Sequence, residues 1–369
     1  MTAHHSGCGC AECQQYRFIR LRLPSDVTSI TTEQLYEHYS KDFRGRVNSV
    51  FTEDTDSGLS DRLRANVSRF AAYKAEYVSG ALQRALNDES IPAAERTKFA
   101  KAVLNTFSRY QDAERSTATA RARTAKQFEE FMDPDNVRLF PNLKWLPSRS
   151  ADPRASHTVF YNHIWPKDDP FWNTNAPGTE WNCKCDIEET SEPATDNSAV
   201  PPTEVPLGLE GNPAKTGEIF TDNASYIRTA NKTRHNAVSN FARHNTIKEG
   251  KRLYDVKVPQ TDEKGAAIDV EFNSNSISHF ANDMLHDRKM WLKKELTPKL
   301  DEVVGKAKLV AFEPNTKLAD KPTHQYYLYY ETKLADGTPL YISVYQNRVD
   351  GKYKFYAVSK TLRKTATRV

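Results

Sequence analysis

The sequence is poor in cysteine and has no long apolar run. Its five Cys are few and odd in number for a chain of 369 residues, whereas secreted disulfide scaffolds use even sets of cysteines. No stretch approaches the roughly 18 consecutive apolar residues of a bilayer-spanning helix, and the mean hydropathy is −0.73. These absences argue against disulfide-rich secreted proteins and against proteins that span a membrane.

The first residues, MTAHHSGCGC, have neither the basic flank nor the apolar core of a signal peptide. We therefore expect synthesis in the cytosol, with thiols that stay reduced or bind metal. The sequence also has no phosphate-binding glycine loop, no G-x-S-x-G motif and no acidic cluster typical of two-metal nucleases. ATP hydrolysis and serine-hydrolase chemistry are therefore not expected.

The positive charge is concentrated in the C-terminal third of the chain. Residues 256–369 contain 19 Lys+Arg against 14 Asp+Glu, a net charge of +5, while residues 1–255 contain 33 against 34, a net charge of −1. This asymmetry is compatible with a nucleic-acid partner, and a solvated basic surface explains it equally well.

Residues 31–132 have the periodicity of amphipathic helices. Apolar residues such as Leu63, Val67 and Phe70 recur every three or four positions with charged residues between them. The stretch from Asn87 to Pro92 interrupts this pattern, and the pattern ends before Pro134 because proline disfavours helix at the residue that precedes it. We expect two or three long helices in this part of the chain.

The remaining segments predict an α+β multidomain protein. Residues 133–190 are irregular but carry four of the five Trp, which favours an ordered structure. Period-two alternation predicts strands at 252–258 and 266–272 and four antiparallel strands near the C-terminus. Between them, apolar positions from Phe280 to Leu300 predict a helix at 276–304. The expected organisation is a Cys/His-rich N-terminus (1–15), a helical module with an irregular Trp/Cys-rich segment (16–190), a Pro-rich linker (191–225), a connecting helix (226–251) and a C-terminal helix-plus-antiparallel-sheet domain (252–369).

The stretch DDPFWNTNAPGTEWNCKC, residues 168–185, combines two Trp, two Pro, an acidic pair and two Cys in eighteen positions. One interpretation is a zinc site, because Cys and His are the usual zinc ligands. A second is acid/base chemistry by Asp168 and Asp169, although adjacent residues on an extended chain point apart. A third is a structural knot of Pro and Trp. The residues leave these interpretations open, and the candidate metal ligands are Cys183, Cys185, His157, His163, Cys8, Cys10 and Cys13.

The same stretch resembles the signature of the Mu-type phage head morphogenesis family of minor head proteins. The positions that carry the resemblance are His157, Asp168, Asp169, Pro170, Phe171, Trp172, Pro177, Gly178, Asn182, Cys183 and Cys185. The sequence departs from the family pattern at Tyr161 and Asn162, where a Gly is usual, at Ala176 for a first Pro, and at Lys184 for Arg. With the preceding helices, the resemblance extends over about 31–190.

This resemblance implies that residues 16–190 form a head morphogenesis domain with a structural role at the portal vertex of a phage or prophage capsid. The implied partners are the portal protein and the capsid, with DNA contact or delivery as a further role and no membrane. The implied locations are the virion and the bacterial host cytoplasm. The resemblance implies no enzyme in this half of the chain.

In this family an extra domain often follows the head module, and many such domains are toxin-like effectors. Residues 252–369 look similar, in topology and residue types, to the phage relatives of the barnase, EndoU, colicin and RelE-like ribonucleases. A metal-independent ribonuclease needs a base, an acid and cations for the phosphate. The candidate catalytic residues are His279, His286, His324, Ser359 and Lys293, and the candidate binding residues are Tyr326, Tyr345, Tyr356 and Lys360.

Two alternatives remain open at this stage. The C-terminal domain could be a non-catalytic module that binds nucleic acid or protein, since histidines on helices and alternating tyrosines on strands are common in ordinary packing. The whole chain could instead be a host protein clipped by zinc, with no role in a phage. Any zinc would be structural, and the chemistry of the C-terminal domain would use no cofactor.

Overall fold

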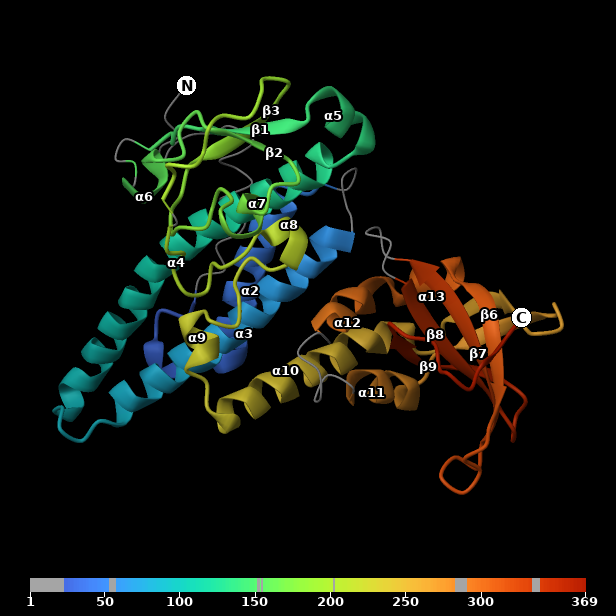
Figure 1. Ribbon diagram of the computed structural model, residues 1–369. Coiled ribbons are helices and arrows are strands. Elements are labelled where there is room, and N and C mark those ends of the chain that lie inside the picture. Colours follow the sequence, from blue (N-terminus) through green and yellow to red (C-terminus); the bar gives the residue numbers. More distant parts are fainter. Residues whose placement is uncertain are drawn as a thin grey trace, which may run out of the picture. The chain divides into compact units, whose positions relative to one another are not determined.

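The computed structural model describes residues 23–52, 58–150, 153, 155–201, 203–282, 291–333 and 339–369 (Figure 1). The chain divides into two compact units, which we call the helical unit (1–56 and 62–234) and the C-terminal unit (57–61 and 235–369). The helical unit carries a small sheet, and the C-terminal unit is built on a large, mainly antiparallel sheet. The expected α+β class is confirmed.

Three long helices form the body of the helical unit, as the sequence predicts: α2 (Thr32–Asn48), α3 (Gly58–Asn87) and α4 (Ala93–Phe131). A short 3-10 helix, η1 (Val27–Ser29), precedes them. Helix α2 begins with a capping box in which Thr31 Oγ1 accepts from the Gln34 amide and Gln34 Oε1 accepts from the Thr31 amide. These reciprocal bonds satisfy amides that have no partner inside the helix.

Buried ion pairs connect these helices to one another. Lys74 on α3 is fully buried and donates to Glu114 on α4, whose other carboxylate oxygen accepts from the Tyr226 hydroxyl at 3.0 Å. Asp42 on α2 accepts from Gln111 at 2.6 Å and forms a salt bridge with Arg115. Buried charges are tolerated only when they are paired in this way.

The Trp/Cys-rich segment folds onto the C-terminal end of α4. It comprises α5 (Pro134–Leu139), β1 (Asn142–Leu146), α6 (Ala155–Thr158), β2 (Ile164–Pro166), α7 (Phe171–Thr174) and β3 (Asp186–Thr190). The strands form an antiparallel sheet in the order β2-β1-β3. Trp145 and Trp172 are fully buried and stack at 6.1 Å, and Trp165 stacks on Phe171 at 3.9 Å. The expected order of this segment is confirmed.

Residues 191–225 are not the linker that the sequence predicts. Leu209 and Phe220 are fully buried, and the segment includes α8 (Pro213–Thr216) and the start of α9 (Ser225–Arg228). The side chain of Asn66 on α3 donates to the Phe220 carbonyl and accepts from the Phe220 amide. The low-complexity composition was misleading because polar side chains of α3 and α4 satisfy the backbone of this segment. The unit boundary lies instead between residues 234 and 235.

The main part of the C-terminal unit begins within α10 (Lys232–Gly250) and continues through the 3-10 turn η3 (Lys251–Leu253). Its strands are β4 (Lys257–Thr261), β5 (Ala267–Glu271), β6 (Lys308–Pro314), β7 (His324–Lys333), β8 (Pro339–Asn347), β9 (Tyr353–Ser359) and β10 (Thr367–Arg368). In the described residues they form one sheet in the order β10-β6-β7-β8-β9-β5-β4, with β5 and β9 parallel and the other pairs antiparallel. The expected strand at 266–272 and the four later strands are present, whereas the strand expected at 252–258 begins only at Lys257, after the 3-10 turn η3.

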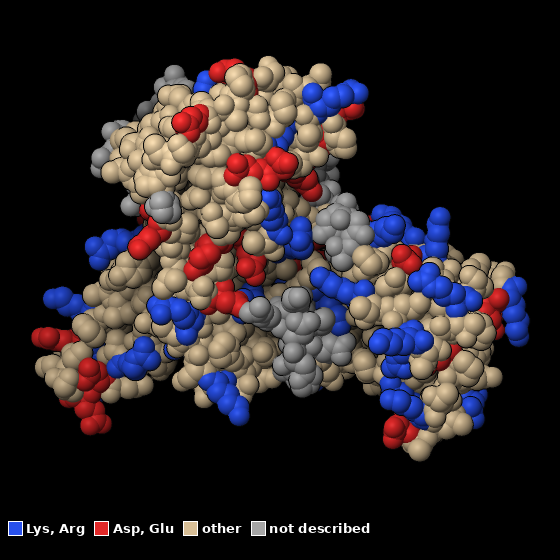
Figure 2. All heavy atoms as spheres, in the orientation of Figure 1, with Lys and Arg blue, Asp and Glu red and all other residues tan. Residues whose placement is uncertain are grey.

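The helix expected at 276–304 is divided. The described pieces are α11 (Ser274–Asn282), α12 (Trp291–Leu296), the 3-10 turn η6 (Thr297–Lys299) and α13 (Leu300–Lys306). Pro298 lies in η6 and lacks the amide that a continuous helix requires, which explains the break between α12 and α13. Figure 2 shows more Lys and Arg than Asp and Glu on the visible face of the C-terminal unit, in agreement with the net positive charge of its sequence.

The two faces of the large sheet differ in character. Leu328, Ile342 and Val344 are fully buried and belong to the face that packs on helices. The neighbouring residues Tyr327 and Tyr345 form a cross-strand pair and therefore point to the opposite face. That second face is rich in Tyr and His, and we call it the tyrosine face.

Candidate functional site

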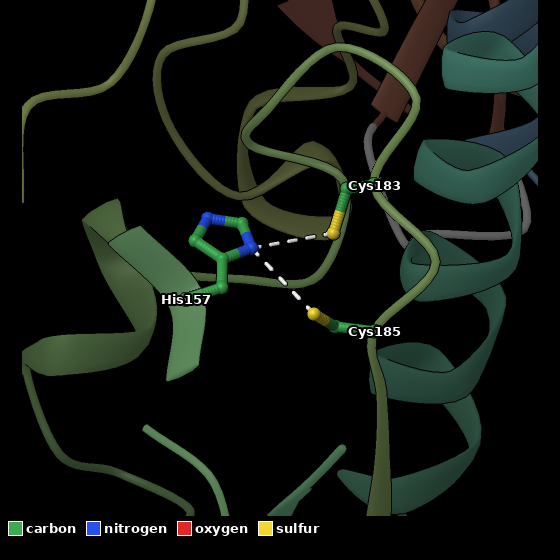
Figure 3. Close-up of side chains that lie close together, drawn as sticks. All are labelled: His157, Cys183 and Cys185. Carbon is green, nitrogen blue, oxygen red and sulfur yellow. Dashed lines mark hydrogen bonds between the residues drawn. The ribbon is translucent and has the colours of Figure 1, made fainter. Parts of the chain in front are cut away.

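A buried group of His157, Cys183 and Cys185 lies in the helical unit (Figure 3). His157 belongs to α6, and the two cysteines immediately precede β3. His157 Nδ1 lies 3.4 Å from Cys183 Sγ and 3.6 Å from Cys185 Sγ, and the three ligand atoms lie within 4.8 Å of one another. Both cysteines are free thiols, so the sulfurs and the imidazole converge without a disulfide.

These distances fit a tetrahedral zinc ion. Zn–S bonds of about 2.3 Å and Zn–N bonds of about 2.0 Å place a sulfur and a nitrogen ligand about 3.5 Å apart. The described residues supply three ligands of the types that zinc prefers. The group could therefore hold a metal ion, while Cys8, Cys10 and Cys13 lie outside the described residues. A cavity of about 290 Å³ is lined by residues of α4 and by the two cysteines.

The loop that presents the cysteines is tied to α4. Gly178 has a φ of +91°, and a Cβ there would lie 2.8 Å from Arg121 Cγ, so this turn requires glycine. Thr124 Oγ1 donates to the Pro177 carbonyl at 2.8 Å, and Thr117 Oγ1 accepts from the Asn182 amide at 3.0 Å. The residues of the sequence signature therefore position the thiols, which supports the knot and the metal interpretations together.

The two thiols differ in acidity. The hydrogen bond with Cys185 lowers the pKa of Cys183 to about 4, and His157 and the Gly178 amide lower it further against the effect of burial. The same contact with Cys183, followed by burial, raises the pKa of Cys185. The lowered pKa of Cys183 favours its thiolate, the form that binds metal.

Other residues suggested for this stretch lie elsewhere. His163 Nδ1 is 2.8 Å from Asn197 Oδ1, and the described residues that converge as possible ligands do not include it. Asp169 Oδ1 accepts from the Phe171 amide at 2.8 Å and so stabilises the start of α7, while Asp168 is exposed. The geometry therefore offers no pair of facing carboxylates here.

A second cluster lies on the tyrosine face of the C-terminal unit. The His324 ring stacks on Tyr345 with centroids 3.7 Å apart, and its Nδ1 lies 2.7 Å from the Tyr327 hydroxyl. The His279 ring from α11 lies 4.1 Å from the ring of Tyr356, which in turn lies 5.5 Å from His324. Four of the residues suggested by the sequence, His279, His324, Tyr345 and Tyr356, are thus brought together.

Two irregularities in strand pairing create this cluster. The register of β8 with β9 passes from Ser343↔Ala357 to Val344↔Phe355, which leaves Tyr356 without a partner on β8. The register of β7 with β8 also shifts directly after His324. Such bulges redirect side chains and occur often beside active sites.

The environment keeps His324 uncharged. Burial, followed by the Lys321 and His279 charges, lowers the pKa of His324 to about 4. Its imidazole is therefore neutral at physiological pH and can accept a proton. Lys321 was missed by the sequence interpretation, because a lysine three residues before a strand histidine carries no signal of its own.

The remaining suggested residues do not join the cluster. Lys293 is only 6% exposed and its Nζ lies 5.5 Å from the Phe280 ring, which corrects the expectation of an accessible phosphate contact. Ser359 donates to the Thr361 carbonyl, and Lys360 is exposed beyond the end of β9. The Tyr326 hydroxyl pairs with that of Tyr353 at 2.8 Å, on the face opposite to Tyr327. His286 lies outside the described residues.

The fold and sites define a two-unit α+β protein whose helical unit holds a buried thiol and imidazole group. A stretch of 119 residues is 31% identical to the Mu-like prophage FluMu F protein of Haemophilus influenzae, and the match covers 31% of this chain and 27% of that protein. The chain thus spans about a quarter of that relative's length. The similarity supports the relation to phage proteins that the sequence signature implied.

Other comparisons add no relative. No family model matches the chain, and no solved structure matches it. Among the described helices, none combines the length and the apolar character that crossing a bilayer requires.

Proposed function

We propose that this chain is a minor head protein of a phage or prophage, which acts at the portal during head assembly or DNA packaging and delivery. The observation that carries this proposal is the similarity to the FluMu F protein, together with the signature residues that converge in the helical unit. Trp172, Gly178 and the two cysteines of the signature all serve one structure, the loop that packs on α4. That arrangement favours a structural role over catalysis in this unit.

Association with phage particles tests the proposal. In the phage or induced prophage that encodes the chain, we expect the protein in purified particles and its co-purification with the portal protein. Particles assembled without the portal protein should lack the chain while retaining the major capsid protein. If the chain is absent from intact particles, or if no portal and terminase genes lie beside its gene, the host-protein alternative replaces this proposal.

Zinc is the metal that best fits the group of His157, Cys183 and Cys185. A bound ion would link α6 to the segment before β3 and would hold the cysteine loop against α4. Cys8, Cys10 or Cys13 would supply a fourth ligand. The ion would be structural.

The C-terminal unit is, in the same proposal, a metal-independent ribonuclease. The convergence of His279, His324 and Tyr356 on the tyrosine face supports this. Neutral His324 would take the proton of the ribose 2′-hydroxyl as its oxygen attacks phosphorus. His279 would give a proton to the departing 5′-oxygen, leaving a 2′,3′-cyclic phosphate. Attack, bond cleavage and the two proton transfers balance without a metal or a redox partner.

RNA cleavage by the full chain tests this part. With single-stranded RNA in buffer without divalent cations, His324→Gln and His279→Gln should each lower kcat/KM by about 10²–10⁴-fold, the usual contribution of general acid or base catalysis. Because the pKa of His324 is lowered to about 4, activity of the wild type should fall as the pH drops toward 4, where the base becomes protonated.

Tyr326→Phe is the matched control, because it removes a hydroxyl from the opposite face of the same strand. Its activity should equal that of the wild type. Binding of RNA without cleavage by the wild type would instead establish the alternative, a non-catalytic nucleic-acid-binding module. Equal activity in the wild type and both histidine variants would assign any cleavage to another site.

A further inference from the structure

Lys321 presents a charge to the tyrosine face without a carboxylate partner among the described residues. Its Nζ donates to the Tyr356 hydroxyl and lies 4.3 Å from the Tyr356 ring centroid and 5.9 Å from that of Tyr327. The residue as a whole is half-buried. An anion that binds beside the Lys321 ammonium would therefore be stabilised by its charge.

The other charged side chains beside the tyrosine cluster are paired with each other. Arg363 lies 5.8 Å from the Tyr327 ring centroid on the same face. Arg363 Nη1 forms a salt bridge with Glu313 Oε2 at 3.8 Å, and Glu313 also accepts from the hydroxyls of Tyr329 and Thr365 at 2.8 and 2.6 Å. Arg363 and Glu313 therefore offset each other's charge, and Lys321 is the cation of this cluster for which the described residues supply no carboxylate.

Both histidines lie within the same aromatic cluster as Lys321. Tyr356 contacts the Lys321 ammonium through its hydroxyl, and its ring faces His279 at 4.1 Å and His324 at 5.5 Å. An anion bound by Lys321 would therefore lie beside the two imidazoles. The lysines suggested by the sequence cannot take this role, since Lys293 is buried against Phe280 and Lys360 follows the end of β9.

We infer that Lys321 binds a phosphate group on the tyrosine face, beside Tyr356 and the histidines His279 and His324. In naming RNA as the source of that phosphate, the inference rests on the proposed ribonuclease function. Lys321 would hold the phosphodiester whose neighbouring 2′-hydroxyl faces His324. The structure thereby adds a phosphate-binding residue to the histidines.

Binding of a nucleoside 3′-monophosphate to the full chain tests the inference apart from catalysis. The probe is 3′-UMP, followed by calorimetry and by the NMR signals of the His324 and His279 rings. Lys321→Met should weaken binding at least about tenfold, as expected for loss of a charge-assisted bond to phosphate. Lys321→Arg should retain most of the affinity, because it keeps the charge. Lys317→Met, an exposed lysine four residues earlier, should bind as the wild type does.

The outcomes separate this inference from the proposed function. If 3′-UMP binds through Lys321 but the wild type does not cut RNA, the phosphate site stands and the ribonuclease proposal fails. If Lys321→Met binds 3′-UMP as tightly as the wild type, or if the wild type does not bind 3′-UMP, the inference is wrong. Unchanged ring stacking of His324 on Tyr345 in the NMR spectra of Lys321→Arg and Lys317→Met shows that the fold is intact.

Discussion

Cys183→Ser is expected to abolish metal binding by the helical unit and to unfold the loop of residues 176–185. Cys183 is the more acidic thiol of the pair and lies 3.4 Å from His157 Nδ1, so serine removes the thiolate ligand. Structural zinc contributes about 10–16 kcal/mol in small zinc-binding peptides. The effect here should be smaller, because the aromatic core around Trp145 and Trp172 remains, yet still large enough to lower the thermal midpoint of this unit.

Elemental analysis of the purified full chain measures the first effect, and scanning calorimetry the second. The wild type should contain about one equivalent of zinc, as a tight structural site does. Chelation of that zinc should lower the thermal midpoint as the variant does. A wild type that contains less than about half an equivalent would leave the two cysteines as packing residues and would remove zinc from the proposal.

His163→Gln is the matched control for the metal site. Both histidines belong to the same segment, but His163 bonds Asn197 and lies outside the ligand group. Its zinc content should equal that of the wild type. Replacement of Cys8, Cys10 and Cys13 together by serine then tests the fourth ligand, because zinc affinity should fall if one of them binds the ion.

Arg121→Ala should destabilise the helical unit by about 3 kcal/mol or more. Arg121 is fully buried and its guanidinium donates to the carbonyls of Leu209, Gly211 and Glu218 at 2.7, 3.0 and 3.1 Å. Burial lowers the pKa of Arg121 to about 10, which leaves the side chain charged at neutral pH. Alanine would leave one buried and two partly buried carbonyls without this donor, at a cost of about 1–3 kcal/mol for each buried unsatisfied group.

Chemical denaturation followed by Trp fluorescence checks this expectation. Trp181 stacks on Phe220 of the same segment, with ring centroids 5.9 Å apart, so its emission reports release of residues 203–224. Arg123→Ala is the control, because Arg123 is an exposed arginine on the same helix and such changes stay within about 0.5 kcal/mol. Similar denaturation midpoints for both variants would show that Arg121 does not hold the segment.

Local periodicity predicted most of the secondary structure. The three long helices and the strands β4 to β9 follow from side-chain spacing, because burial of one face of an element imposes its period on the sequence. The signature residues likewise indicated an ordered structure in the Trp/Cys-rich segment. Composition predicted the structure less well, because it indicated a linker at residues 191–225. In the structure this segment is ordered, and Arg121 on α4 and Asn66 on α3 donate hydrogen bonds to its backbone.

The two candidate sites were also predictable from the sequence only in part. The sequence by itself determined the ligand types and named both histidines of the tyrosine face, because Cys and His carry their chemistry wherever they lie. Only the tertiary structure decided that His157 rather than His163 meets the cysteines, and that Lys321 rather than Lys293 or Lys360 reaches Tyr356. The physical reason is that these contacts depend on a positive φ at Gly178 and on bulges beside His324 and Tyr356. Such features arise from packing between elements that are distant in the chain, and residue spacing does not encode them.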